Sequence, residues 1–228
     1  MTTGLPRVIL TTVSLSAIPL IGIVIVGVFL GVKFSAMTND VAAIANIHPL
    51  SGFLSSLGIL LWWASATVWL FTASLMQKSR ETSGLAVLVF SGLLSMYLAF
   101  DDLFQFHEHL APVYFRVSEK AVYGLIAFVT TLYLYRYRRL LCREDAILLL
   151  LALLFLSGSV LCDTALKPWL RRFEDWSYLL EDALKWVGIC FWTAFCLFRC
   201  SQVLRSVLPV APRESGDQGR VSSEPLER

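Results

Sequence analysis

The chain has 228 residues, of which 57% are hydrophobic and 16% are charged, and its mean hydropathy is +0.68. A soluble domain normally carries about 25% charged residues, so an apolar excess of this size requires a lipid bilayer to cover it. This composition excludes most soluble enzymes, nucleic-acid-binding proteins and disordered proteins. The formal net charge of +2 says little about partners, because the positions of charges matter more than their sum in a membrane protein.

Six apolar segments are long enough to cross a hydrocarbon core of roughly 30 Å, which takes about 20 helical residues. In chain order they cover residues 8–32, 50–76, 84–106, 121–141, 146–162 and 179–204. The first is too long for the apolar part of a signal peptide, so we expect it to be retained as a helix. The sequence therefore predicts an all-α, polytopic integral membrane protein with a six-helix transmembrane domain over residues 1–205. The polar tail over residues 206–228 is rich in Pro, Ser and Gly and is expected to be disordered.

Lys and Arg are more frequent in the connections on one side of the predicted bundle. If the N-terminus is cytoplasmic, ten of them lie on the cytoplasmic side and six on the other. The densest group lies between the end of the fourth segment and the start of the fifth and consists of Arg136, Arg138, Arg139 and Arg143. The positive-inside rule therefore predicts that both termini are cytoplasmic, in a plasma or inner membrane.

The acidic residues and histidines sort to the opposite, non-cytoplasmic side. With this orientation, ten of the seventeen acids and all three histidines lie there. The ten acids are Asp40, Asp101, Asp102, Glu108, Glu119, Asp163, Glu174, Asp175, Glu181 and Asp182. Ionisable residues close to hydrocarbon are costly and usually face protein, water or a partner charge. The sorting predicts a polar site at the outer ends of the helices.

The densest polar segment covers residues 101–109, at the outer end of the third predicted helix. Successive residues of a helix point about 100° apart, so one stripe carries most of these groups. Its members are Asp101, Gln105 and Glu108, with Asp102 and His109 just beyond. On such a helix His107 points elsewhere.

Carboxylate and imidazole groups in this region suggest a site for a divalent cation such as Zn²⁺, Mn²⁺ or Fe, with an open position that activates water. The expected metal ligands are Asp102, Glu108, His109 and Asp163. The expected catalytic residues are Asp101, Asp102, Glu108 and Glu181, with Glu181 or Asp163 as general base. In this hypothesis the site performs metal-assisted hydrolysis of a lipid or lipid-like substrate. One difficulty is that Asp102 and His109 lie about 10.5 Å apart along a straight helix, so one ion reaches both only if the helix bends.

Two other functions fit the same residues. A transporter or ion-handling protein would use the acids as ligands for a cation at the outer face. An accessory or assembly subunit without chemistry would neutralise them in structural ion pairs with Lys185, Arg116 and Lys120. The sequence leaves the substrate and the oligomeric state open.

Ser55 or Ser56 on an early helix, Asp101 or Asp102 at a helix end, and His107 or His109 nearby form an arrangement that resembles a superfamily of membrane hydrolases. The superfamily includes alkaline ceramidases and adiponectin-receptor-like proteins, which are seven-helix zinc amidohydrolases. Its members take two zinc ligands from a late HxxxH helix, whereas this chain has no histidine after His109. Because only short fragments match, we make no family assignment from the resemblance.

Overall fold

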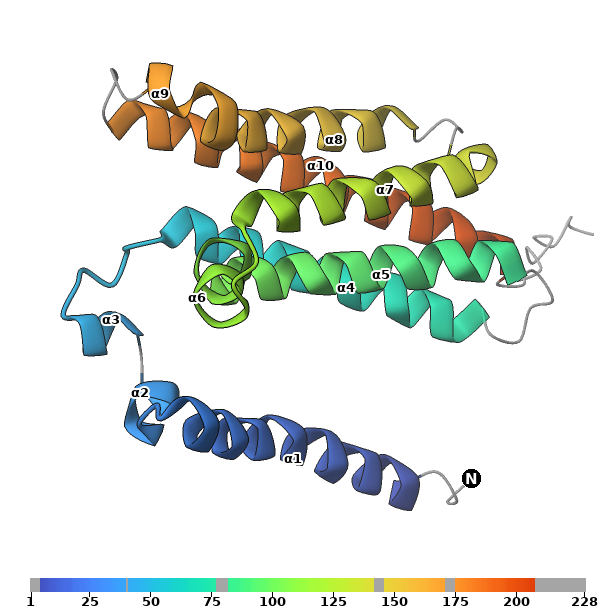
Figure 1. Ribbon diagram of the computed structural model, residues 1–228. Coiled ribbons are helices and arrows are strands. Elements are labelled where there is room, and N and C mark those ends of the chain that lie inside the picture. The colour runs from blue at the N-terminus through green and yellow to red at the C-terminus, as the bar shows by residue number, and fades with distance from the viewer. Residues whose placement is uncertain (1–4, 40, 77–81, 142–145, 171–174, 208–228) are drawn as a thin grey trace, which may run out of the picture. The chain divides into compact units, whose positions relative to one another are not determined.

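The structure is a computed structural model that describes residues 5–39, 41–76, 82–141, 146–170 and 175–207. These residues form helices and connections, with no β-strand among them. The chain divides into two compact units, Met1–Phe53 and Leu54–Arg228, whose helices are labelled in Figure 1.

The first unit contains one long apolar helix and two short ones. α1 (Leu5–Leu30) ends at Gly31, whose φ of +66° is easily adopted only by a residue without a Cβ atom. α2 (Phe34–Thr38) turns back and packs against α1. The approach is close, since a Cβ atom on Gly27 would lie only 2.7 Å from the ring of Phe34. α3 (Val41–Ala45) follows. Only 6% of the apolar span of α1 is buried, so most of its surface is left for lipid or protein to cover.

The long helices of the second unit run side by side in Figure 1. They are α4 (Phe53–Met76), α5 (Thr82–Phe104), α7 (Glu119–Leu141), α8 (Ala146–Leu161) and α10 (Asp175–Val207). Short helical segments lie in two of the connections. The π-helical turn η1 (Phe106–Leu110) and α6 (Ala111–Phe115) join α5 to α7, and the π-helical turn η2 (Cys162–Leu166) and α9 (Lys167–Leu170) follow α8.

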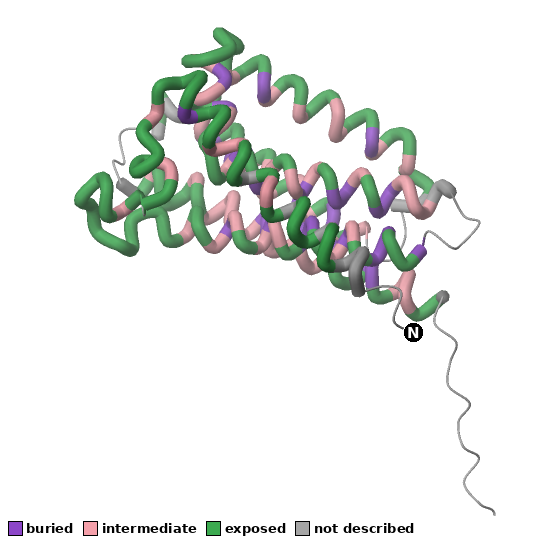
Figure 2. The backbone as a smooth tube through the Cα atoms, turned by 90° about the horizontal axis from the view of Figure 1, so that it is seen from below, coloured by how far each residue is buried: buried purple, intermediate pink, exposed green. Residues whose placement is uncertain are grey.

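Large aromatic side chains fill the centre of the second unit. Trp62 and Trp69 of α4 are buried against α10, where the ring of Trp62 lies 6.0 Å from that of Trp192 and the ring of Trp69 lies 5.7 Å from that of Phe195. Figure 2 shows buried residues recurring along the helices, with exposed residues between them. A bilayer supplies the apolar solvent that the exposed apolar side chains need.

A glycine allows α8 and α10 to pack closely. A Cβ atom on Gly188 of α10 would lie 2.7 Å from the side chain of Leu156 and 2.9 Å from its backbone nitrogen. Small residues at such contacts let two membrane helices approach until their backbones nearly touch. This contact holds the C-terminal helix pair together.

Five helices among the described residues are long and apolar enough to cross a membrane: α1, α4, α5, α8 and α10. A sixth crossing is formed if α7 is counted together with η1 and α6, from which it is bent by 120°. The predicted all-α polytopic bundle is confirmed, and each of the six predicted segments falls on a helix. α10 continues to Val207, and residues 208–228 of the predicted disordered tail lie outside the described residues.

Candidate functional site

Polar residues of the site lie on the two π-helical turns and on the helix ends beside them. His107, Glu108 and His109 belong to η1, and Asp163 belongs to η2. π-helical turns are rare and often occur at functional sites, because the extra residue per turn redirects the side chains that follow. Both turns therefore mark this end of the second unit as its candidate site.

The chain reverses direction at Gln105. α5 ends at Phe104, and Gln105 adopts a left-handed conformation with φ 50° and ψ 46°. Its carbonyl oxygen then accepts hydrogen bonds from the backbone N–H groups of His109, at 2.8 Å, and Leu110, at 3.3 Å. A left-handed conformation costs a residue with a Cβ atom roughly 1–2 kcal/mol, so other contacts must hold this turn in place.

One of those contacts joins Asp101 to His107. Asp101 accepts two hydrogen bonds from His107, one from its backbone N–H at 3.0 Å and one from its ring Nδ1 at 2.6 Å. Both residues are buried, at 4% and 5% exposure. The prediction that His107 points away from Asp101 is wrong, because it assumed a straight helix where the structure has a left-handed residue and a π-helical turn.

Tyr123 of α7 extends this pair to a third helix. The hydroxyl of Tyr123 lies 2.8 Å from Nε2 of His107, and it donates a longer hydrogen bond of 3.5 Å to Asp163. The rings of His107 and Tyr123 are also in contact, with centroids 4.7 Å apart. A hydrogen-bonded chain thus runs from Asp101 through His107 and Tyr123 to Asp163.

The directions of these hydrogen bonds agree with a protonated His107. Its two ring N–H groups then donate to Asp101 and Tyr123, and Tyr123 donates to Asp163. Glu108 adds a second carboxylate, 3.4 Å from Nε2 of His107. Negative charges at these distances favour the charged form of an imidazole.

Asp102 belongs to a separate network. Nζ of Lys185 on α10 donates to its Oδ1 at 2.6 Å, and the indole N–H of Trp62 on α4 donates to its Oδ2 at 3.2 Å. The Asp102 side chain is 7% exposed and that of Lys185 is 34% exposed. The ion pair that the structural alternative predicts for Lys185 is therefore present, and it ties α5 to α10.

A small cavity of about 10 Å³ lies next to this ion pair. Its polar lining comes from Ser55, Asp102, Asp182 and Lys185. The volume is enough for about one water molecule. It is too small for an organic substrate.

The predicted metal ligands are not brought together. Asp102 is bound to Lys185, and Asp163 lies beside Tyr123, while Glu108 and His109 are 3.9 Å apart with side chains 47% and 68% exposed. Across residues 5–39, 41–76, 82–141, 146–170 and 175–207, no group of three or more His, Cys, Asp or Glu side chains is placed to hold a metal ion. The reason is that Asp102 faces Lys185 of α10 and Trp62 of α4, whereas Glu108 and His109 lie on η1, after the left-handed residue that ends α5.

Of the four predicted catalytic residues, the structure groups two. Asp101 and Glu108 both contact His107, whereas Asp102 lies in the Lys185 network. Glu181, the predicted general base, is half-buried in the second turn of α10.

Sequence reasoning missed Tyr123 and Trp62. Tyr123 lies near the start of the fourth predicted segment and therefore at the same level as the polar segment 101–109. That level is a weak signal, since no spacing rule connects the two positions. Trp62 gave no signal at all, because an indole within an apolar helix is typical of packing.

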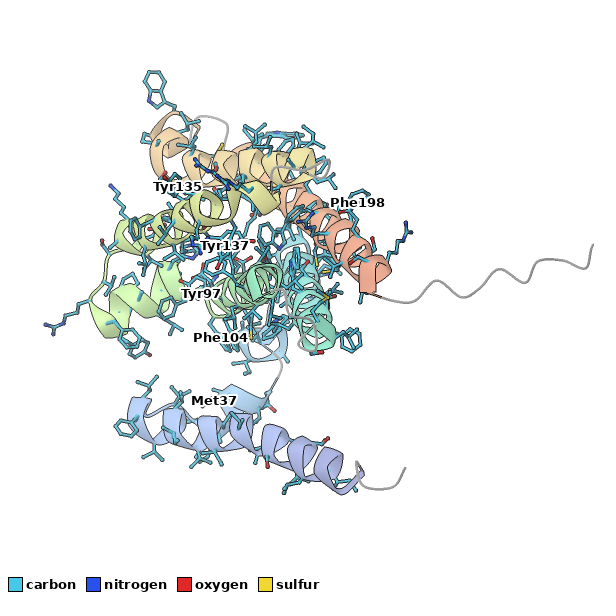
Figure 3. All side chains as sticks on the ribbon, turned by 90° about the vertical axis from the view of Figure 1, so that its right-hand side faces the viewer. Met37, Tyr97, Phe104, Tyr135, Tyr137 and Phe198 are labelled. Atoms are coloured by element: carbon cyan, nitrogen blue, oxygen red, sulfur yellow. The ribbon has the colours of Figure 1, made fainter. Side chains whose placement is uncertain are left out.

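An apolar groove of about 590 Å³ opens beside the His107 chain, between α5 and α7. Phe106, Ala111 and Phe115 line the end of it that lies nearest η1. Tyr97 is the one lining residue with a polar side-chain atom, and Figure 3 shows it on the side of α5 that faces α6 and α7. Volumes of about 300–1,000 Å³ are typical of sites for small organic ligands.

The fold and the site together define a polytopic α-helical membrane protein with a hydrogen-bonded Asp–His–Tyr chain at one end of the helices of its second unit. Residues 8–200 match the family described as Domain of unknown function (DUF8692), and the chain belongs to that family. No curated protein and no solved structure matches the chain. The comparisons therefore add no support for the resemblance to alkaline ceramidases.

Proposed function

We propose that this protein acts on a lipid-like molecule by proton transfer at the non-cytoplasmic surface of a membrane. The observation that carries the proposal is the hydrogen-bonded chain Asp101–His107–Tyr123, in which Asp101 and His107 are buried and Tyr123 is half-buried. Ionisable groups kept this close to hydrocarbon are costly, and they are usually retained for a function.

Each residue of the chain has a defined part in this proposal. Asp101 holds the ring of His107 through Nδ1, which directs Nε2 toward Tyr123 and the exposed carboxylate of Glu108. In hydrolysis of a lipid ester, Glu108 takes a proton from water as the water oxygen attacks the carbonyl carbon. The bond to the leaving oxygen breaks, and that oxygen receives the proton of His107. In this scheme Asp101 is a positioning residue, and His107 and Glu108 are the catalytic residues.

The experiment compares wild type with His107→Gln and His109→Gln, each purified and placed in vesicles made from a total lipid extract. Mass spectrometry then follows the lipid species over time. We expect His107→Gln to slow the conversion by roughly 10²–10⁴-fold, the usual contribution of one acid–base group. His109→Gln should keep the rate, because its exposed side chain lies outside the hydrogen-bonded chain. A lipid profile that is the same with wild type as in protein-free vesicles would refute the proposal.

The sidedness of the site is part of the same proposal. The excess of Lys and Arg in the connections supports cytoplasmic termini, which puts His107 on the non-cytoplasmic side. A reporter fused to the C-terminus that is active only in the cytoplasm tests this orientation. Activity of a reporter that works only outside would reverse it.

A structural role is the second candidate, because the Lys185–Asp102–Trp62 network fully accounts for Asp102 without any ligand. An accessory subunit would use the His107 chain in the same way, as a clamp between α5, η1 and α7. In that case His107→Gln lowers the thermal stability of the protein and changes no lipid species. Loss of lipid conversion with stability unchanged would favour the acid–base proposal.

A further inference from the structure

We propose that the groove between α5 and α7 binds the acyl chain of a phospholipid whose anionic head group lies between Arg116 and Lys120. This inference rests on the proposed function and names the chemical class of its substrate. The groove has about 590 Å³ and an almost wholly apolar lining, which suits a hydrocarbon chain.

The groove runs along the helices, which is the direction that an acyl chain takes in a bilayer. On α7 its lining runs from Ala121 to Val129, and on α5 from Tyr97 to Phe90. Eight residue steps of a helix cover about 12 Å along its axis. The groove therefore follows the two helices into the apolar part of the bundle and starts at the end where His107 lies.

Two cations are next in the chain to residues that line the η1 end of the groove. Arg116 comes between the lining residues Phe115 and Val117, and Lys120 directly precedes the lining residue Ala121. Both side chains are exposed, and Glu119 between them is half-buried. Arg and Lys are the side chains that bind phosphate most strongly, through charge-assisted hydrogen bonds. Charge complementarity therefore selects a lipid whose head group carries a net negative charge over a zwitterionic or uncharged lipid or an apolar helix.

The segment that carries Arg116 is held in an unusual conformation. Arg116 ends α6 in the left-handed region with φ 56° and ψ 26°, and its backbone N–H donates to the carbonyl of Ala111. This conformation ends the short helix there and starts the turn into α7 beside the groove. A bound head group would lie next to η1, so the polar end of the lipid comes to the residues that the proposed reaction uses.

The groove also has a defined relation to the hydrogen-bonded chain of polar residues. Phe106 and Val122 line it, and they are the neighbours in sequence of His107 and Tyr123. A chain in the groove therefore places the ester bonds that join it to its head group at the level of η1 and the start of α7, where His107 and Tyr123 lie.

The test uses phosphatidylglycerol with a photoreactive group in the acyl chain, in nanodiscs of otherwise neutral phosphatidylcholine. After illumination, peptide mass spectrometry locates the cross-links and gives their yield. We expect cross-links in the α5 and α7 residues that line the groove. The double variant Arg116→Gln/Lys120→Gln should lower their yield by about tenfold, as the loss of charge-assisted contacts predicts. Arg139→Gln, at the other end of α7, is the charge control and should leave the yield unchanged.

Filling the groove provides a second variant that does not depend on charge. Leu125→Trp places a large ring on a lining residue, whereas Leu132→Trp makes the same change at an exposed position of α7 outside the lining. Only Leu125→Trp should abolish the cross-links. Because both leucines are more than half exposed, at 62% and 56%, both variants should fold equally well.

The outcomes separate this inference from the proposed function. His107→Gln should still cross-link at the groove. If wild type is labelled there but converts no lipid, the result supports the binding site and rejects the reaction. Conversion of lipids without groove cross-links supports the reaction and rejects the binding site. Equal labelling with photoreactive phosphatidylcholine, labelling spread over all exposed helix faces, or cross-links only between two copies of the chain would each overturn the inference.

Discussion

Lys185→Met tests the ion pair that ties α5 to α10. The variant keeps the length and apolar part of the side chain but removes the charge that faces Asp102 at 2.6 Å. Removing one partner of a buried ion pair typically costs about 3–5 kcal/mol, because the other charge stays buried without compensation.

The expected magnitude is smaller here for two structural reasons. The Lys185 side chain is 34% exposed, so water screens part of the interaction, and Trp62 continues to donate to Asp102. We therefore expect a loss of about 2–3 kcal/mol in the free energy of unfolding. At about 2–4 °C per kcal/mol for a chain of this size, the unfolding midpoint should fall by about 4–12 °C.

The assay is thermal unfolding of the detergent-purified protein, followed by circular dichroism. Arg205→Met is the matched control, an exposed cation near the other end of the same helix, and it should change the midpoint by less than about 2 °C. The double variant Asp102→Asn/Lys185→Met leaves no buried charge, so it should be more stable than Lys185→Met alone. If the two single losses simply add in the double variant, Asp102 and Lys185 are not coupled and the reasoning is wrong.

Two further predictions concern backbone geometry, each checked by the same unfolding midpoint. Gly188→Ala should destabilise the protein by about 1–3 kcal/mol, because its Cβ atom would meet the backbone nitrogen of Leu156 at 2.9 Å. Gly158→Ala is its control, since there the nearest atom lies at 3.7 Å, and an equal loss in both variants would contradict the close contact. Gln105→Gly should raise stability by up to about 1 kcal/mol, because glycine adopts the left-handed conformation of φ 50° without strain. A clear loss of stability in this variant would show that the Gln105 side chain makes a contact worth more than the strain.

Sequence patterns were sufficient for the helices because span length is a local property. Each crossing needs about 20 apolar residues, and that requirement is visible as a block of sequence whatever the neighbours are. The fourth crossing was the exception. α7 qualifies as a span only together with η1 and α6, and the 120° bend between them depends on the left-handed residue Arg116, which carries no sequence signal for that conformation.

The site was predictable in its level along the helices but not in its pairings. The segment 101–109 was expected to be one helical stripe, yet the turn at Gln105 brings His107 back onto Asp101. A π-helical turn holds more residues than an α-helical turn, so it changes the direction of every side chain after it. An expectation based on a regular α-helix therefore pairs the wrong groups. The expected metal set of Asp102, Glu108, His109 and Asp163 depended on that stripe.

The sequence by itself determined that this is a polytopic α-helical membrane protein, and it predicted that the acids and histidines gather at one end of the helices. Both properties follow from transfer of single side chains between water and hydrocarbon, which depends on residue type and position in the chain. Only the tertiary structure decided that Asp101 bonds His107 while the adjacent Asp102 bonds Lys185. Asp101 and Asp102 point about 100° apart because they are neighbours on a helix. The partner that each one meets depends on how the helices pack around the whole bundle, which the sequence pattern does not show.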